Sequence, residues 1–439
     1  MSTQDLDLLV LGATGYTGSL VLRYLVSHPN RASFKLAVGV RSSSKAESLL
    51  QSLAVEPSQV TVVELDVQNE VQVEAAVARA KVVINVVGPF WLYGTPVIKA
   101  CARRGVHYVD LTVGETEWIY SVLNEVHELA SKSGAIIIPS CGVDSVPSDL
   151  GVFLSTRALK QYCESKGLVW PGAAASESGI VGDITPSGGS FATLLTSLTQ
   201  VPAQILKATS SPYCLSPIRG QSLPALTSFK TLRLLQDYPY GAPWALAKAD
   251  TAIVMRSWGL FAQHDRDVAS SGIAGDVLGY GDKFTYDEFT AHKSLLSAVL
   301  AAGITLLFKL LLSFSAMRSM LAKQNPPGTG ASPESLENGR FKVINVTRLA
   351  GDASPPIDAR TEITFSCDAG YLGASVLAAE SALALLLTRR EGLGLMSAQR
   401  GGLFTPATVL GDVLPQRFAK SRYIDISTTI VSHEQQKLR

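Results

Sequence analysis

The stretch LVLGATGYTGSLVLRYL, residues 9–25, joins an apolar run to a helix-like run through three glycines. The spacing G-x-x-G-x-x-G between a strand and a helix is typical of dinucleotide-binding folds. Gly12 permits the tight turn, Gly15 lets backbone N–H groups approach a pyrophosphate, and Gly18 allows the helix to pack closely on the sheet. The stretch therefore predicts a nucleotide site where the helix N-terminus faces phosphate charge, with an empty structural turn as the alternative.

The first third of the chain alternates strand-like and helix-like segments. Short apolar runs suit strands that are buried on both faces, and amphipathic runs of helix length lie between them. The expected strands are 7–12, 34–40, 60–65, 81–88, 106–111 and 135–140, and the expected helices are 17–27, 44–53, 69–80, 95–104 and 115–132. Six strands with five crossovers predict a doubly wound parallel α/β sheet, whose ligands bind at the carboxyl ends of the strands.

The pattern changes from about residue 146 onward. Strand-like runs such as FKVINVTRLAG and RTEITFSC are separated by long connections rich in Pro, Gly and Ser, at 200–247 and 323–338. We therefore expect a Rossmann dinucleotide-binding domain over residues 1–145 and an α+β domain with a mixed sheet over residues 146–439. The helix-like run 372–387 is a candidate to pack back on the first domain, and a cleft between the domains would enclose a hydride acceptor.

Composition argues against several classes of protein. A length of 439 residues favours two domains, and a net charge of +1 argues against a nucleic-acid partner. The five cysteines form no C-x-x-C pair and the six histidines never stand at H-x-x-x-H spacing, so no metal site is expected. The first residues show no basic segment followed by an apolar core, as a signal peptide would. These features favour an intracellular, cytoplasmic protein with reduced thiols.

The end of the second expected strand favours one nicotinamide cofactor over the other. An NAD site usually places an acid there, whereas a 2′-phosphate calls for a cation and hydroxyls. The chain has GVRSSSK, with Arg41 and Ser42 and no acid, so NADP(H) is preferred over NAD(H). The alternative is that Arg41 faces solvent without a ligand. Asp66, after the third strand, is a candidate to bind the adenine amino group or to cap the helix that starts near Asn69.

Two later loops add candidates at the same edge of the sheet. GPF follows the fourth strand, where a small residue lets the backbone approach the nicotinamide ribose. The cofactor-binding residues are therefore predicted to be Gly12, Ala13, Thr14, Gly15, Tyr16, Thr17, Gly18, Arg41, Ser42, Asp66, Val87, Gly88 and Pro89. Tyr93, Asp144 and Ser148 are the candidate catalytic residues, with core packing as the alternative for Tyr93 and helix capping for Asp144. The PSGGS run, residues 186–190, is a candidate anion cradle or a plain loop.

Blocks along nearly the whole chain resemble one family. They are GATGYTG (12–18), NVVGPFWLYGTPVIKACARRGVHYVDLTVGE (85–115), CGVDSVPSDLG (141–151), PSGGSFAT (186–193), NPPGTGASPESLENGRF (325–341), DAGYLGASVLAAESALAL (368–385) and GGLFTPAT (401–408). Together they resemble the saccharopine dehydrogenase-like oxidoreductases, which include trans-acting enoyl reductases of lipid and polyketide pathways. The resemblance implies NADP(H)-dependent reduction of a C=C or C=N bond in a hydrophobic, lipid- or polyketide-like substrate. Ser190, Thr329 and Ala369 depart from the family pattern, which bears on fine substrate contacts.

The segment 294–317 breaks the pattern of a soluble domain. It is apolar over nearly the length that a bilayer span needs, but it contains Lys309 and several small polar residues. A buried helix, an interfacial helix on a lipid droplet or membrane surface, and a span remain open. The family resemblance favours lipid contact, because membrane- or lipid-droplet-associated members have a similar segment. A homodimer is a further open expectation.

Two other functions compete with the reductase. Ser148, Tyr162 and Lys166 have the residue types of a short-chain dehydrogenase, but the Y-x-x-x-K pair lies beyond the sixth strand, where such a pair does not border the nicotinamide. A non-catalytic nucleotide-binding protein on a lipid surface is the other alternative. Saccharopine formation itself is disfavoured, because its dicarboxylic substrates call for clustered arginines, whereas Arg256 and Arg318 are isolated.

Overall fold

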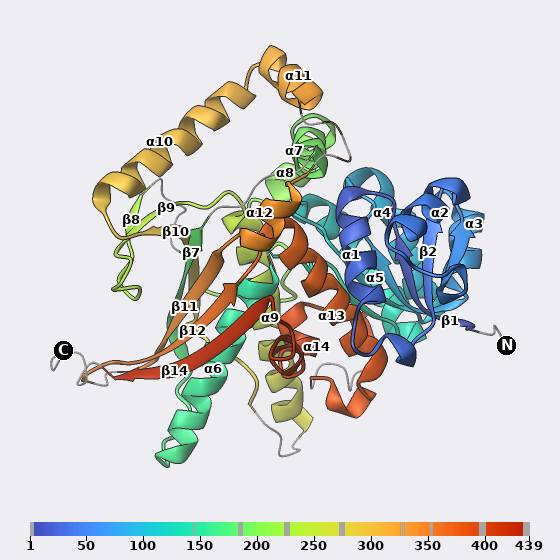
Figure 1. Cartoon of the computed structure of the whole chain (residues 1–439). Coiled ribbons are helices and arrows are strands. Elements are labelled where there is room, and N and C mark those ends of the chain that lie inside the picture. Colours follow the sequence, from blue (N-terminus) through green and yellow to red (C-terminus); the bar gives the residue numbers. More distant parts are fainter. Residues whose placement is uncertain are drawn as a thin grey trace.

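Two seven-stranded sheets organise the protein (Figure 1). The computed structural model describes residues 4–143, 145–182, 188–223, 229–271, 277–324, 326, 328, 330–351, 354–394 and 401–432. Sheet A is built mainly from the N-terminal third of the chain, and sheet B from residues after 172. The expected combination of a doubly wound α/β sheet with a mixed-sheet α+β unit is confirmed.

Sheet A is entirely parallel, with the strand order β13-β6-β5-β4-β1-β2-β3. Its strands are β1 (Leu6–Leu11), β2 (Leu36–Val40), β3 (Val60–Glu64), β4 (Ala80–Asn85), β5 (His107–Asp110), β6 (Ile136–Ile138) and β13 (Gly402–Leu403). The first six match the predicted strands, whereas β13 comes from the GGLFTPAT block near the C-terminus. Sheet A therefore takes an edge strand from outside residues 1–145.

Helices cover both faces of sheet A, because each strand is apolar on both sides. Leu8 and Val10 of β1 belong to one buried cluster with α1 (Tyr16–Val26), α2 (Ser43–Ser52) and α13 (Ala374–Leu387). Leu9 and Leu11 belong to a second cluster with α3 (Glu70–Val77), α4 (Phe90–Arg104) and α5 (Thr116–Ser133). Side chains that alternate along β1 thus pack against helices on both faces of sheet A.

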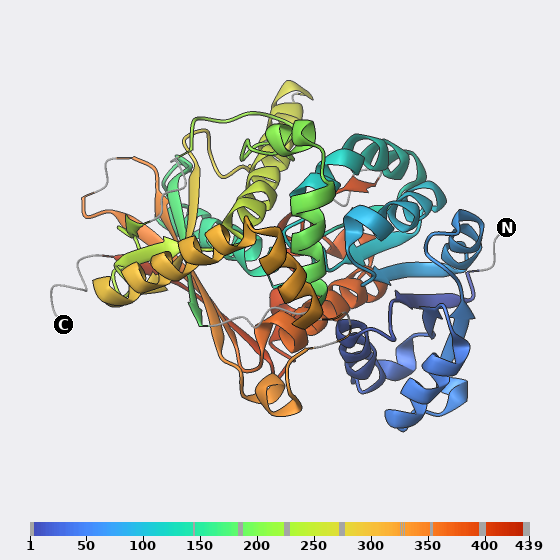
Figure 2. The same cartoon turned by 90° about the horizontal axis from the view of Figure 1, so that it is seen from above.

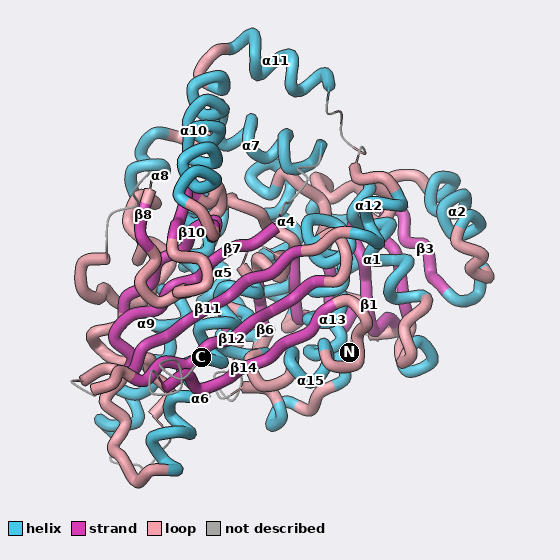
Figure 3. Tube along the Cα trace, turned by 60° about the vertical axis from the view of Figure 1, so that its left-hand side comes forward, coloured by secondary structure: helices cyan, strands magenta, loops and turns pink. Residues whose placement is uncertain are grey.

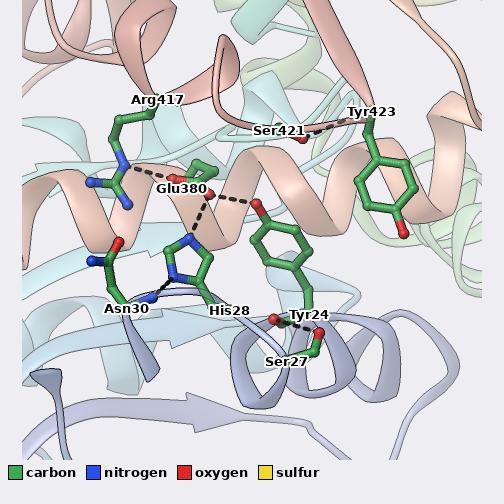
Figure 4. Close-up of polar contacts among 8 residues, drawn as sticks. All are labelled: Tyr24, Ser27, His28, Asn30, Glu380, Arg417, Ser421 and Tyr423. Atoms are coloured by element: carbon green, nitrogen blue, oxygen red, sulfur yellow. Dashed lines mark hydrogen bonds and ion pairs between the residues drawn. The ribbon is translucent and has the colours of Figure 1, made fainter. Parts of the chain in front are cut away.

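A buried carboxylate joins α1 to the C-terminal part of the chain (Figure 4). Glu380 of α13 accepts hydrogen bonds from Tyr24 (2.5 Å) and His28 (3.1 Å), and its other oxygen accepts from Nε of Arg417 (2.6 Å). Arg417 lies in α15 (Leu414–Phe418). Glu380 itself is 2% exposed, so the cluster sits inside the protein and couples α13 and α15 to the nucleotide-binding unit.

Sheet B has the order β14-β12-β11-β7-β10-β9-β8 (Figure 3). Its strands are β7 (Ala173–Gly182), β8 (Lys230–Thr231), β9 (Tyr240–Pro243), β10 (Thr285–His292), β11 (Phe341–Leu349), β12 (Ile357–Phe365) and β14 (Ile424–Ser432). The β7–β10 pair is parallel and the other pairs are antiparallel. Two long helices, α6 (Val146–Ser165) and α9 (Ala247–Ser271), pack against this sheet and against each other.

The predicted apolar segment forms an exposed arm over the top of the molecule (Figures 1 and 2). It consists of α10 (Leu295–Leu312), which contacts β9 and β10, and α11 (Ser315–Gln324), which contacts α7 (Gly188–Gln200). Only 11% of α10 is buried, compared with 83% of the comparably apolar segment Ala369–Leu387. The buried-helix alternative for residues 294–317 is therefore wrong. These two segments are long and apolar enough to cross a membrane, among the residues that the structure describes.

Short helices complete the fold. They are α8 (Ala203–Ala208), α12 (Pro333–Asn338) and α14 (Pro406–Leu410). Asp149 of α6 ties α14 in place, because its carboxylate accepts from the Ala407 N–H (2.8 Å) and from the Ser257 hydroxyl (2.5 Å). Burial raises the pKa of Asp149 to about 7.

Candidate active site

The glycine turn lies between β1 and α1, as predicted, and its shape requires glycine at two positions. Gly12 has φ +86°, and a Cβ there would lie 2.9 Å from Cγ2 of Val87. A Cβ on Gly18 would lie 2.1 Å from the Gly12 carbonyl oxygen, so only glycine lets α1 approach the strand this closely. The Gly15 N–H donates to the same carbonyl (2.9 Å), which closes the turn.

The N-terminus of α1 is left open towards a ligand. Gly15 is its N-cap residue, and no side chain of the described residues caps the helix. Ala13 is buried, whereas Thr14 and Gly15 are exposed at the turn. Uncapped N–H groups at the first turn of a helix carry partial positive charge and suit a phosphate. The turn is therefore suited to bind a pyrophosphate.

Tyr16 and Thr17 are held by the C-terminal part of the chain. The Tyr16 hydroxyl donates to the Ala331 carbonyl (2.5 Å), and its ring packs edge-on against Tyr371 at 4.8 Å between centroids. The Thr17 carbonyl accepts from the Ser375 hydroxyl (3.3 Å). The Tyr16 side chain therefore joins α1 to the C-terminal part of the chain, and only the backbone of Tyr16 belongs to the glycine turn.

The end of β2 carries the predicted selectivity residues. Arg41 is exposed and forms no ion pair within the described part of the chain, and Ser42 is the N-cap residue of α2. Sequence reasoning missed Glu64 at the end of β3, whose carboxylate accepts from the Ser43 hydroxyl (2.6 Å). The adjacency of β2 and β3 in the sheet explains why an acid 21 residues away stands beside this loop.

Asp66 holds a turn rather than a helix. Its carboxylate accepts from the Gln68 N–H (3.0 Å), and Asn69 is the residue that caps α3 by accepting from the Gln72 N–H (3.2 Å). The capping alternative for Asp66 is therefore wrong. Its carboxylate lies on the same edge as Glu64, directly after β3.

The loop after β4 is rigidly held. The Asn85 side chain accepts from the Val87 N–H (3.1 Å), Gly88 is exposed, and Pro89, which follows a cis peptide bond, is the N-cap residue of α4. Both oxygens of the buried Glu115 are engaged, by the N–H groups of Phe90 (3.0 Å) and Trp91 (2.9 Å). Burial raises the pKa of Glu115 to about 7. Unlike α1, α4 therefore has its N-terminus already occupied by a carboxyl group.

Tyr93 packs against the apolar cluster beneath α4 and α5, and is half-buried there. This position agrees with the packing alternative. Asp144, the second candidate catalytic residue, lies outside the described residues, as do residues 186 and 187 of the PSGGS run.

Ser148 lies in a buried polar cluster at the start of α6. Its hydroxyl donates to Oε1 of Glu288 on β10 (2.5 Å), and the Tyr286 hydroxyl donates to the same oxygen (3.0 Å). Asp250 of α9 also hydrogen-bonds Glu288, and it accepts from Trp244 (3.1 Å) and Ser145 (3.3 Å). Sequence reasoning missed Asp250 and Glu288, because neither lies in a recognisable motif.

Two carboxyl groups in hydrogen-bonding contact must share a proton. Asp250 is 0% exposed and Glu288 1% exposed, so both would be costly to ionise together. Asp250 and Glu288 each accept from two donors, so the shared proton belongs to the pair rather than to one of the two residues. Burial raises the pKa of Glu288, although its hydrogen bonds oppose the shift. This buried pair thus holds one proton between two carboxyl groups, next to Ser148.

The residues of the short-chain dehydrogenase alternative are not brought together. Ser148 lies in the first turn of α6, and Tyr162 lies in its last turn. Fourteen residues of α-helix separate them by about 21 Å along the axis. Lys166 instead lies over the ring of Tyr162, 6.0 Å from its centroid.

Comparison with known proteins places this geometry in a family. The model described as the saccharopine dehydrogenase NADP binding domain matches residues 8–138. A protein of Mycobacterium tuberculosis, provisionally named a trans-acting enoyl reductase, is 30% identical, and the match covers 94% of this chain and 95% of that protein. A trans-acting enoyl reductase of Mycobacterium ulcerans is 28% identical over 97% of this chain and 99% of its own length. Apo saccharopine dehydrogenase (L-Glu forming) from Saccharomyces cerevisiae aligns with 97% of this chain and 100% of its own, at 12% identity and a TM-score of 0.46.

The chain therefore belongs to the saccharopine dehydrogenase-like family of NAD(P)-dependent oxidoreductases, as its motifs predicted. The two mycobacterial relatives match the chain over nearly its full length, and both are named as trans-acting enoyl reductases, the first provisionally.

Proposed function

We propose that the protein uses NADPH to reduce a C=C or C=N bond in a hydrophobic, lipid- or polyketide-like substrate. The observation that carries the proposal is the uncapped N-terminus of α1 behind a glycine turn, inside a segment that matches an NADP binding domain. The names of the full-length relatives support the enoyl form of this reaction.

The preference for NADPH over NADH rests on Arg41. Its exposed guanidinium forms no ion pair among the described residues, and it stands beside the hydroxyls of Ser42 and Ser44, which lie 3.0 Å apart. A cation flanked by hydroxyls suits the 2′-phosphate. Glu64 is the competing feature, since an acid at this edge suits the ribose of NADH, but Ser43 engages its carboxylate.

Proton delivery is assigned to the cluster at the start of α6. Bound NADPH would supply a hydride to one atom of the reducible bond, and the adjacent atom must then gain a proton. Ser148 lies in the first turn of the helix that follows β6, on the edge of sheet A where such folds bind their ligands. In the relay, the Ser148 hydroxyl gives its proton to the substrate and takes one from protonated Glu288, which is left as a carboxylate.

Lipid docking is assigned to the arm of α10 and α11. Its exposed apolar side chains are Leu295, Leu296, Val299, Leu300, Ile304, Leu306, Leu307, Phe308, Leu310, Phe314 and Met320. No acid occurs from residue 289 to residue 333, whereas Lys293, Lys309, Arg318 and Lys323 do. An apolar helix with cations only suits the surface of an anionic lipid layer. Such docking would place the protein where a hydrophobic substrate resides.

Turnover is tested with NADPH and a long-chain α,β-unsaturated acyl thioester. We expect loss of NADPH absorbance together with transfer of deuterium from deuterated NADPH to the saturated product. NADPH binding without any turnover on enoyl or imine substrates would instead favour the non-catalytic alternative.

Docking is tested by co-sedimentation with vesicles of phosphatidylcholine and phosphatidylserine. Replacing Leu300, Ile304 and Leu307 by serine should weaken binding about 100-fold, because each exposed side chain loses on the order of 1 kcal/mol of lipid contact. Replacing Val71 and Val169, which are 79% and 90% exposed elsewhere, is the matched control and should change nothing. Equal sedimentation of all variants, or a dimer that forms through the arm and leaves vesicles unbound, would contradict the assignment.

A further inference from the structure

A pocket of about 440 Å³ lies away from the glycine turn, between α5 and α9. Its polar lining includes Asn124 and His127 from α5 and Arg256 and His264 from α9, and the loop 214–217 closes one side. None of the cofactor-binding candidates lines it. The pocket is therefore separate from the proposed cofactor site.

Arg256 is a buried cation without a carboxylate partner. The residue is only 3% exposed, and its guanidinium donates to the carbonyl oxygens of Leu215 and Leu403. Its Nε has no hydrogen-bond partner, and no ion pair reaches it within the described ranges. Burial lowers the pKa of Arg256 to about 10, so the group stays charged at neutral pH.

Other partly or fully buried arginines of this protein are neutralised differently. Arg348 lies 2.8 Å from Asp358, and Arg417 lies 2.6 Å from Glu380. A buried charge that meets only carbonyl oxygens keeps most of its desolvation cost. Arg256 is thus set up to gain free energy from an anion that enters the adjoining pocket.

The other pocket groups are compatible with a negative ligand. His127 accepts from the Leu403 N–H at Nδ1 (3.2 Å), so the neutral ring carries its proton on Nε2 and is a donor there. Asn124 and Gln263 add amide donors. Asp267 is the one acid among the lining residues, and it is exposed at the rim.

We propose that this pocket binds a small anion, carrying a carboxylate or a phosphate, through the guanidinium of Arg256. The anion would brace α9 against β13 and the loop 214–217, since Arg256 already contacts both. Asp250 of the proton-storing pair lies on the same helix, six residues or about 9 Å before Arg256. Occupancy of the pocket therefore has a direct mechanical route to the reduction site.

The test measures thermal unfolding of the full chain in increasing succinate, and separately in inorganic phosphate, at constant ionic strength. We expect a saturable rise in Tm with at least one of the two, and the comparison of the two arms tells a carboxylate ligand from a phosphate. Arg41→Ala should keep the response, which separates it from phosphate binding at the proposed 2′-phosphate site after β2.

Two variants test whether the rise in Tm comes from anion binding in this pocket. Arg256→Lys should weaken the apparent affinity at least tenfold, because a lysine cannot offer the planar fork. His264→Glu places a negative charge on the pocket wall without touching the two carbonyl contacts of Arg256, and should abolish the response even if Arg256→Lys fails to fold. Ser270→Glu, an exposed position further along α9, adds the same charge outside the pocket and should respond like the wild type. No saturable response in the wild type, or an unchanged response in His264→Glu, would overturn the proposal.

Discussion

At the scale of single residues, two side chains carry the proposed reaction. Arg41 places an exposed charge after β2, and Glu288 places a buried carboxyl next to Ser148. The sequence indicated Arg41 because its position after a strand is a local property. Glu288 meets Ser148 across 140 residues of chain, so no local pattern could reveal the pair.

Replacing Arg41 with alanine should raise KM for NADPH about 10- to 100-fold, because a charge-assisted hydrogen bond contributes about 1.5–3 kcal/mol. KM for NADH should change little, since NADH has no 2′-phosphate. Steady-state kinetics with both cofactors measure this difference. An equal effect on the two cofactors would place Arg41 outside the cofactor site.

Glu288→Gln should lower kcat about 100- to 10,000-fold with little change in KM, because glutamine can keep the contacts with Ser148 and Asp250 but has no proton to give. The wild-type kcat should fall as the pH rises through the elevated pKa of Glu288, and the variant should lose this dependence. Asp149→Asn, which alters another buried carboxyl, on α6, is the control and should retain the pH profile of kcat. A variant with the wild-type pH profile would assign Glu288 a structural role only.

At the scale of elements, buried carboxyls join helices that are distant in sequence. Asp149 joins α6 to α14, and Glu380 joins α13 to α1 and α15. The sequence predicted the helices from their apolar spacing, but it could not show these junctions, since each depends on the packing of separate segments.

Glu380→Gln should destabilise the protein by about 3 kcal/mol, because it leaves the largely buried Arg417 without its charge partner. Denaturant unfolding measures the loss. Glu128→Gln removes an exposed i,i+4 pair with Lys132 and should leave the midpoint unchanged. Equal midpoints for the two variants would show that the Glu380 cluster adds no stability.

The raised pKa of Asp149 predicts how the free energy of unfolding changes with pH. Its folded-state pKa of about 7 lies above the ordinary value of 3.8, so the folded state binds the extra proton between these values. Stability should therefore be lost as the pH rises from about 4 to 7, by up to about 1.4 kcal/mol per pH unit from this group. Unfolding of Asp149→Asn across this range should show a shallower fall than the wild type. A parallel pH dependence would contradict the raised pKa.

At the scale of the whole molecule, the sequence predicted the six central strands and the mixed second sheet, because apolar runs and glycine turns are local signals. It missed β13, which reaches sheet A from the C-terminal part of the chain. It also left the position of α10 open, since a buried helix and an exposed arm share the same apolar composition. The structure decides between them, because α10 extends over the top of the molecule and is only 11% buried (Figure 1).

Thermal unfolding of the full chain with NADPH and with NADH tests most simply whether the glycine turn binds a dinucleotide. NADPH at one hundred times its Kd should stabilise the protein by about 2.7 kcal/mol, with a smaller effect of NADH at the same concentration. Absence of any shift with either cofactor would show that the open N-terminus of α1 holds no dinucleotide.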